Sequence, residues 1–106
     1  MLELSNLKKE IDDLDLFERS WIEQNELFAS GEEENGDVLL IVKRIEYSYL
    51  VKIFWKSPFS NDQSGMVCMS HNQLKHISIQ DVLNIISNAR KTIENQISSS
   101  IKSLKI

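Results

Sequence analysis

"SGEEENGDVLLIV", residues 30–42, joins a run of acidic residues directly to the most apolar segment of the chain. VLLIV, at 38–42, is apolar at every position, which is typical of a central strand covered on both faces. GEEENGD, at 31–37, combines charge with two glycines, as expected for a polar connection that leads into such a strand. The stretch therefore predicts a buried strand that begins near residue 38.

A second strand is predicted next, because YSYLVKIFWK at 47–56 alternates between two faces with a period of two. One face carries Tyr47, Tyr49, Val51, Ile53 and Trp55, and the other carries Ser48, Leu50, Lys52, Phe54 and Lys56. The chain is expected to reverse at 44–47, although no glycine or proline marks a turn there, so one long bent strand is the alternative. MVCMS at 66–70 predicts a third strand, and the three strands form an antiparallel meander.

Helical periodicity precedes this sheet. Leu7, Ile11, Leu14, Phe17 and Trp21 recur every three or four residues and predict an N-terminal helix. We expect it to continue to about residue 29, before Gly31, since EQNE at 23–26 contains poor strand formers. The alternative is that residues 21–29 are extended and face the strand at 38–42, with Asn35-Gly36 as a tight turn.

A second helix is predicted at the C-terminal end. Ser78 followed by Asp81 forms a capping box, in which each side chain accepts a hydrogen bond from the backbone N–H of the other residue. The apolar positions after it fall on one stripe: Val82, Ile86, Ala89, Ile93, Ile97, Ile101 and Leu104. This helix is expected to cover the face of the sheet that carries Tyr49. The other face, with Leu50 and Phe54, then needs cover from the N-terminal helix or from a partner.

The predicted fold class is therefore α+β, with an N-terminal helix, an antiparallel meander of three or four strands, and a long C-terminal helix packed on the sheet. A chain of 106 residues is expected to form a single domain, 1–106, around one core. The longest hydrophobic region, 38–55, contains four charged residues and is not expected to span a membrane. The N-terminus lacks the pattern of a secretory signal and the chain has one cysteine, so we expect a cytoplasmic protein.

Charge is distributed very unevenly. Residues 1–37 hold twelve acidic against three basic side chains, a net charge of −9, whereas residues 38–106 hold nine basic against four acidic ones, a net charge of +5. Such a segment can attract a basic partner and repel phosphate backbones. The alternative is that these acids are only the solvated face of an N-terminal helix. The predicted partner-binding residues are Asp12, Asp13, Asp15, Glu23, Glu26, Glu32, Glu33, Glu34 and Asp37.

Signals for catalysis or metal binding are weak. Cys68, His71 and His76 have a spacing that superficially resembles half of a zinc site, but a second cysteine is missing. We expect Cys68 to be a small buried side chain and the two histidines to lie on the surface. Phosphate-binding loops and nucleophile motifs are absent from the sequence, so we expect no enzyme activity, no metal and no cofactor.

These features favour a small acidic protein-binding inhibitor of the immunity type, which neutralises a basic toxin such as a nuclease by covering its active site. Size and acidity resemble those of bacterial toxin-immunity proteins in general character, and no motif carries that resemblance. One alternative is a secretion chaperone or assembly factor that binds a protein client as a homodimer. Nucleic acid and membranes are not expected partners; a nucleic-acid module would have to use Lys43, Arg44, Lys52, Lys56, Arg90 and Lys91.

Overall fold

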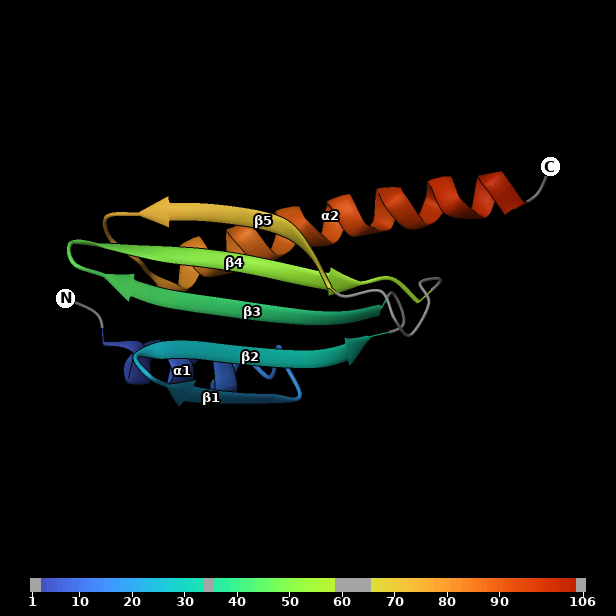
Figure 1. The fold of residues 1–106 in the computed structure, drawn as a ribbon. Coiled ribbons are helices and arrows are strands. Elements are labelled where there is room, and N and C mark those ends of the chain that lie inside the picture. Colours follow the sequence, from blue (N-terminus) through green and yellow to red (C-terminus); the bar gives the residue numbers. More distant parts are fainter. Residues whose placement is uncertain (1–2, 34–35, 59–65, 105–106) are drawn as a thin grey trace.

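Five consecutive strands and two flanking helices make up the fold (Figure 1). The computed structural model describes residues 3–33, 36–58 and 66–104, and for residues 33 and 100–104 it describes the backbone alone. The elements are α1 (Leu4–Asp13), β1 (Arg19–Glu23), β2 (Glu26–Glu33), β3 (Gly36–Ile45), β4 (Ser48–Lys56), β5 (Val67–Leu74) and α2 (Ile79–Leu104). The strands form one antiparallel sheet in the order of the chain. The α+β class and the meander are confirmed, but the sheet has five strands rather than three or four.

The additional strands come from the segment that we expected to be helical. Helix α1 ends at Asp13, and residues 19–33 form the hairpin β1–β2. Its two turn residues, Gln24 and Asn25, have φ angles of 50° and 63°. Two successive left-handed residues match the twist of a two-residue hairpin, and asparagine tolerates that conformation well. The prediction of a helix to residue 29 is therefore wrong.

The alternative that residues 21–29 are extended and face the strand at 38–42 is correct for residues 26–29, because β2 pairs with β3 from Glu26↔Lys43 to Glu33↔Gly36. Residues 21–23 are also extended, but they pair with β2. Asn35, expected in the connecting turn, lies outside the described residues. Gly36 itself has a φ of +115°, and a Cβ there would collide with the carbonyl oxygen of Lys56. Only glycine fits this position without strain, so the start of β3 depends on it.

The strands β3 and β4 form a second hairpin. They reverse at Glu46 and Tyr47, inside the predicted window, and pair from Asp37↔Lys56 to Ile45↔Ser48. Side chains along β4 alternate strictly between buried and half-buried, which confirms the predicted period of two. The third predicted strand is present as β5, and it extends to Leu74.

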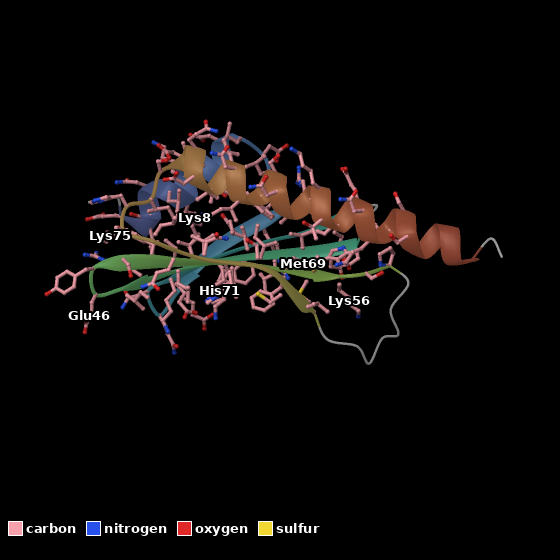
Figure 2. The ribbon with its side chains drawn as sticks, turned by 90° about the horizontal axis from the view of Figure 1, so that it is seen from above. Lys8, Glu46, Lys56, Met69, His71 and Lys75 are labelled. Carbon is pink, nitrogen blue, oxygen red and sulfur yellow. The ribbon has the colours of Figure 1, made fainter. Side chains whose placement is uncertain are left out.

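Both helices pack on the same face of the sheet. Helix α1 lies against β1 and β2, α2 lies against β4 and β5, and the two helices contact each other. The view along the sheet in Figure 2 shows the two helices on one side of the strands. The capping box is confirmed, because Ser78 Oγ accepts the N–H of Asp81 at 3.2 Å and Asp81 Oδ2 accepts the N–H of Ser78 at 3.1 Å.

The core lies between the helices and this covered face. Its buried side chains on α2 are Val82, Ile86, Ala89 and Ile93, as the helical stripe predicted. The strands contribute Leu27, Ala29, Val38, Leu40, Val42, Tyr49, Val51, Ile53 and Trp55, and α1 contributes Leu7 and Ile11. The expectation that 38–42 is covered on both faces is wrong within the described residues, because Leu39 and Ile41 point to the side without helices and are half-buried. None of the described helices is long and apolar enough to cross a membrane.

Candidate functional site

One face of the sheet carries no helix, and we call it the open face. Cross-strand partners lie on the same side of a sheet. The register of the four strand pairs therefore defines this face from the partners Trp21↔Phe28, Phe28↔Ile41, Ile41↔Lys52 and Lys52↔His71. In Figure 2 the labels of His71 and Lys56 lie on this side, opposite the helices.

A band of apolar side chains crosses the open face, and we call it the apolar stripe. Phe28 and Ile41 are direct cross-strand partners, as are Leu39 and Phe54. A sheet face that is simply solvated has polar side chains at these positions. The stripe is half-buried by its own neighbours and consists of Trp21, Phe28, Leu39, Ile41, Leu50 and Phe54.

The N-terminal end of the stripe is rigidly arranged. The rings of Trp21 and Phe28 are stacked, with centroids 5.4 Å apart and planes inclined by 10°. The guanidinium of Arg19 lies 5.4 Å from the centre of the Trp21 ring, and Arg19 Nε donates to Ser30 Oγ at 3.2 Å. These contacts hold the two aromatic rings in one orientation.

A shallow hollow of about 640 Å³ lies beside these rings, and we call it the acidic hollow. Glu32 and Asp37 are direct cross-strand partners on its rim, and Glu18 approaches from the segment before β1. Glu18 Oε1 accepts the backbone N–H of Glu32 at 3.2 Å, which holds the carboxylate near the other two. Like charges placed opposite each other destabilise a sheet. Arg19 also lines the hollow, and Lys56 is the partner of Asp37 on β4, so cationic side chains of the chain itself lie beside these carboxylates.

Two further predicted acids lie on the open face but outside the hollow. Glu23 and Glu26 are cross-strand partners beside the turn that joins β1 and β2. The carboxylate of Glu26 is 3.5 Å from the ammonium of Lys43, its partner on β3. Glu33 is described by its backbone alone, and Glu34 lies outside the described residues.

The remaining predicted acids lie on the helix side of the molecule. Asp12 and Asp13 are at the end of α1, and Asp15 follows it with a φ of 52°. Asp12 Oδ2 is 2.8 Å from Lys8 Nζ, and Asp12 also accepts a hydrogen bond from the Ser20 hydroxyl. The hydrogen bond from Lys8, followed by that from Ser20, lowers the pKa of Asp12. The structure thus divides the predicted acidic patch between the two sides of the sheet, and Asp12 serves to tie α1 to β1.

Basic side chains of the open face lie mainly on the opposite half of the sheet. Lys52 and Lys56 are on β4, and His71 faces Lys52 from β5. Lys43 lies on the central strand, next to Glu26. Arg19 is held against Trp21 on β1, and Asp37 on β3 is the direct partner of Lys56. Charges of both signs therefore flank the apolar stripe, which crosses the open face from β1 to β4.

Cys68 is exposed on β5 rather than buried, because β5 is an edge strand with Cys68 on the side of Phe54. Its thiol is 3.4 Å from the carbonyl oxygen of Ser70. His71 and His76 are exposed, as predicted. Among the described residues, no group of three histidine, cysteine or carboxylate side chains is close enough to hold a metal ion.

Four residues of this surface were missed from the sequence: Glu18, Arg19, Trp21 and Phe28. The predicted N-terminal helix includes all four, and its periodicity places Trp21 on the same face as Leu7 and Ile11. The signal that could have revealed them is the pair Gln24-Asn25, since asparagine is one of the few residues that readily adopt a positive φ in a hairpin turn. The chain matches no family model, and comparison with the curated proteins and with the solved structures found no match.

Proposed function

We propose that this protein binds a basic protein through its open face and inhibits it, in the manner of an immunity protein that covers the active site of a toxin such as a nuclease. The observation that carries the proposal is the acidic hollow beside the stacked rings of Trp21 and Phe28, on a face that no helix covers. Such an inhibitor needs no chemistry of its own and acts in the cytoplasm of the cell that it protects.

Two physical effects support this role. Carboxylates at Glu18, Glu32 and Asp37 attract a cationic surface from a distance, and steering of this kind raises association rates by about 10- to 1,000-fold. Aromatic side chains supply most of the contact energy once water is excluded, and tryptophan is among the residues most enriched at binding hot spots. The acids would thus set the rate of encounter, and Trp21 with Phe28 would set the lifetime of the complex.

The test starts with the wild-type chain and a variant that reverses two acids of the hollow, Glu32→Lys with Asp37→Lys. Each is immobilised and exposed to an extract of cells that produce the protein. A basic protein retained by the wild type and lost by the variant is then purified, and its activity is measured with and without the chain. Stoichiometric inhibition is the expected result. Retention of proteins that are not basic, or binding without inhibition, would contradict the proposal.

A matched control distinguishes the effect of charge in the acidic hollow from the effect of the net charge of the whole chain. Glu10→Lys with Asp13→Lys makes the same change in net charge, but both positions are exposed on α1, on the helix side of the sheet. At low salt the hollow variant should associate with the purified partner at least about 10-fold more slowly, and the α1 variant much less so, because the field is strongest near its source. Equal effects of the two variants would show that net charge alone acts, and the hollow would lose its role.

A second candidate is a chaperone or assembly factor that holds a protein client as a homodimer. The apolar stripe favours it, since half-buried aromatic and aliphatic side chains can hold an extended peptide of little charge. The two candidates differ in their response to salt. Binding to a basic partner weakens as salt is added, whereas binding of an apolar segment is maintained.

A further inference from the structure

The two edges of the sheet differ in how well they are protected against further strands. An edge strand directs every second pair of backbone N–H and C=O groups away from the sheet, and proteins commonly block such an edge with charged residues or keep it short. The strand β1 has five residues, with Arg19 and Glu23 at its two ends, and it lies against α1. The strand β5 has eight residues, and none of them is a lysine, arginine, aspartate or glutamate. Of the two edges, β5 is therefore the one that can accept a further strand.

The outer side of β5 is accessible. Figure 1 shows β5 as the outermost strand, opposite β1, and Figure 2 looks down on this edge, with α2 beside the strand rather than across it. Among the described residues, β4 is the only segment that forms backbone hydrogen bonds with β5. The backbone groups that point away from β4 are thus left to solvent in the single chain.

A bulge limits the part of this edge that can pair. The register between β4 and β5 shifts at Met69, the additional residue, and it is regular from Ser70 to Leu74. We call residues 70–74 the edge segment. Its members His71 and Gln73 lie on the open face, and the other three lie on the face that carries the helices. A second strand can therefore form one continuous ladder with the edge segment, but not across the bulge.

The cost of ordering decides which kind of strand can pair there. A flexible peptide loses backbone entropy at each residue that it adds to a sheet, and this loss is comparable to or larger than the net gain from one backbone hydrogen bond. Peptides that bind by strand addition offset the loss with side chains that fill pockets. Four of the five residues of the edge segment are polar, so it offers little apolar surface for this purpose. The edge therefore favours a strand that is already folded, which loses no such entropy.

A second copy of this chain supplies such a strand, and the faces of the two strands match. When a two-fold axis passes through Asn72, perpendicular to the sheet, His71 lies opposite Gln73 of the second copy, and Ser70 lies opposite its Leu74. Each pair joins residues of the same face, as an antiparallel ladder requires, and no two like charges are opposed. An axis through His71 or Gln73 would leave part of the edge segment unpaired.

The ends and the centre of this ladder also fit. Lys75 follows the edge segment and would lie opposite Met69 of the second copy, so the ladder ends where the charge meets the bulge. At the axis the two Asn72 side chains face each other. Asn72 Nδ2 donates to Ser70 Oγ at 2.7 Å. The amide group has a second hydrogen and an oxygen, with which it can bind the Asn72 amide of the second copy.

We propose that two copies of this chain pair through residues 70–74, antiparallel about a two-fold axis at Asn72, and join their sheets into one. A symmetric contact of this kind uses the same edge of both copies, so assembly ends at the dimer. The contact involves one pair of strands and is smaller than a standard interface, so the dimer should form and dissociate with concentration. Charged side chains take no part in it, so added salt should change it little.

The dimer does not depend on the proposed function. Because the axis is perpendicular to the sheet, the helices of both copies lie on one side of the joined sheet and both open faces lie on the other. The acidic hollow of each copy remains accessible, so each can bind a basic partner. A failure of the dimer would leave the proposed function standing, and a failure of the proposed function would leave the dimer standing.

The test is sedimentation equilibrium of the purified chain over a range of concentrations, with charges introduced at His71 and Gln73, which are both exposed. The wild type should rise from the mass of one chain, 12.3 kDa, toward twice that value. His71→Lys with Gln73→Lys should remain at the mass of one chain, and so should His71→Glu with Gln73→Glu, because like charges then meet at both symmetric contacts. An equimolar mixture of these two variants should restore the dimer.

Two control variants test the register and the location of the contact. His71→Glu with Gln73→Lys changes the same positions, but opposite charges then meet across the axis, so this variant should dimerise at least as well as the wild type. Glu23→Lys lies on the open face at the other edge of the sheet and should leave the dimer unchanged. Thermal unfolding of each variant verifies that the chain remains folded.

Hydrogen exchange of the wild type locates the contact without any substitution. Alternate backbone amides of the edge segment, those that point away from β4, should exchange several-fold more slowly at concentrations at which the dimer forms. The proposal is overturned if the wild type stays monomeric at every concentration, or if these amides gain no protection in the dimer. It is also overturned if the two like-charge variants still dimerise alone, or if their mixture does not.

Discussion

The covered face and the open face of the same sheet differ in what occupies alternate positions of the same strands. On β3, Leu40 is fully buried beneath the helices, whereas Leu39 is half-buried on the open face. On β4, Ile53 is 1% exposed and the adjacent Phe54 lies half-buried on the other side. Residues one position apart thus serve different purposes. The comparison teaches that one apolar strand can stabilise the fold with one face and remain available for a partner with the other.

The largest expected change in stability comes from substituting the neighbouring leucines of β3, of which one lies on each face. Leu40→Ala should lower the free energy of unfolding by about 2–5 kcal/mol, because it leaves a cavity in the core. Leu39→Ala removes the same atoms from a half-buried site and should cost about 1 kcal/mol. Urea unfolding of both variants measures the difference in the free energy of unfolding. Equal losses would mean that the open face is as essential to folding as the covered one.

The two tryptophans offer a second test, because one lies on each face. Trp55 is 5% exposed on the covered face, and Trp21 is half-buried on the open face. In dilute solution, acrylamide should quench the fluorescence of the Trp55→Phe variant several-fold more strongly than that of the Trp21→Phe variant. Equal quenching of both residues would show that the faces do not differ in access to solvent.

A smaller effect on stability is expected at the start of α2, the helix that packs on β4 and β5. Ser78→Ala removes the hydroxyl that accepts the N–H of Asp81 at the start of α2, and should lower stability by about 1 kcal/mol. Ser87→Ala, at an exposed position farther along the same helix, should be neutral or slightly stabilising, because alanine is the better helix former. Thermal unfolding of the pair distinguishes the cap from a general effect of serine. A cap without effect would mean that packing alone holds α2 on the sheet.

The smallest expected effect on stability concerns Asp12, whose hydrogen bond with Ser20 joins α1 to β1. The pKa of Asp12 is lowered from its ordinary value of 3.8 by hydrogen bonds from Lys8 and Ser20. The stabilisation is therefore present above the unfolded value and is lost as the pH falls through the folded one. Asp12→Asn should cost less than about 1 kcal/mol at neutral pH, because the pair is exposed. The gap between wild type and variant, measured by urea unfolding, should narrow below pH 3.8.

Asp13→Asn provides the matched control for this pH dependence, since Asp13 is exposed one position along α1. Its unfolding free energy should follow that of the wild type more closely than Asp12→Asn does across the same pH range. A constant gap for Asp12→Asn down to low pH would show that its carboxylate does not stabilise the attachment of α1.

The sequence predicted the features that follow from local patterns, and it failed where the structure depends on pairing between segments. The stripe from Val82 to Ile93, the capping box of Ser78 and the alternation along β4 are local patterns, and all three are confirmed. Trp21 shows where such reasoning fails. Its spacing from Phe17 fits a helix, but pairing with Phe28 across a two-residue turn places it in a strand. Tertiary pairing overrode the helical period. Of the residues that line the acidic hollow, Glu18, Arg19 and Phe28 were missed for the same reason, whereas Glu32 and Asp37 were predicted.

For the acidic segment, the sequence indicated the excess of charge but not its direction in space. Asp12 and Asp37 both belong to that segment, yet one ties a helix to the sheet and the other lies on the rim of the hollow. The sequence by itself determined the class of fold, the faces of β4 and the stripe of α2, because each follows from the fixed repeat of a helix or a strand. Only the tertiary structure decided that both helices share one face and leave Leu39 and Ile41 uncovered. No local pattern specifies against which side of a sheet a helix packs, since that choice depends on contacts between segments far apart in the chain.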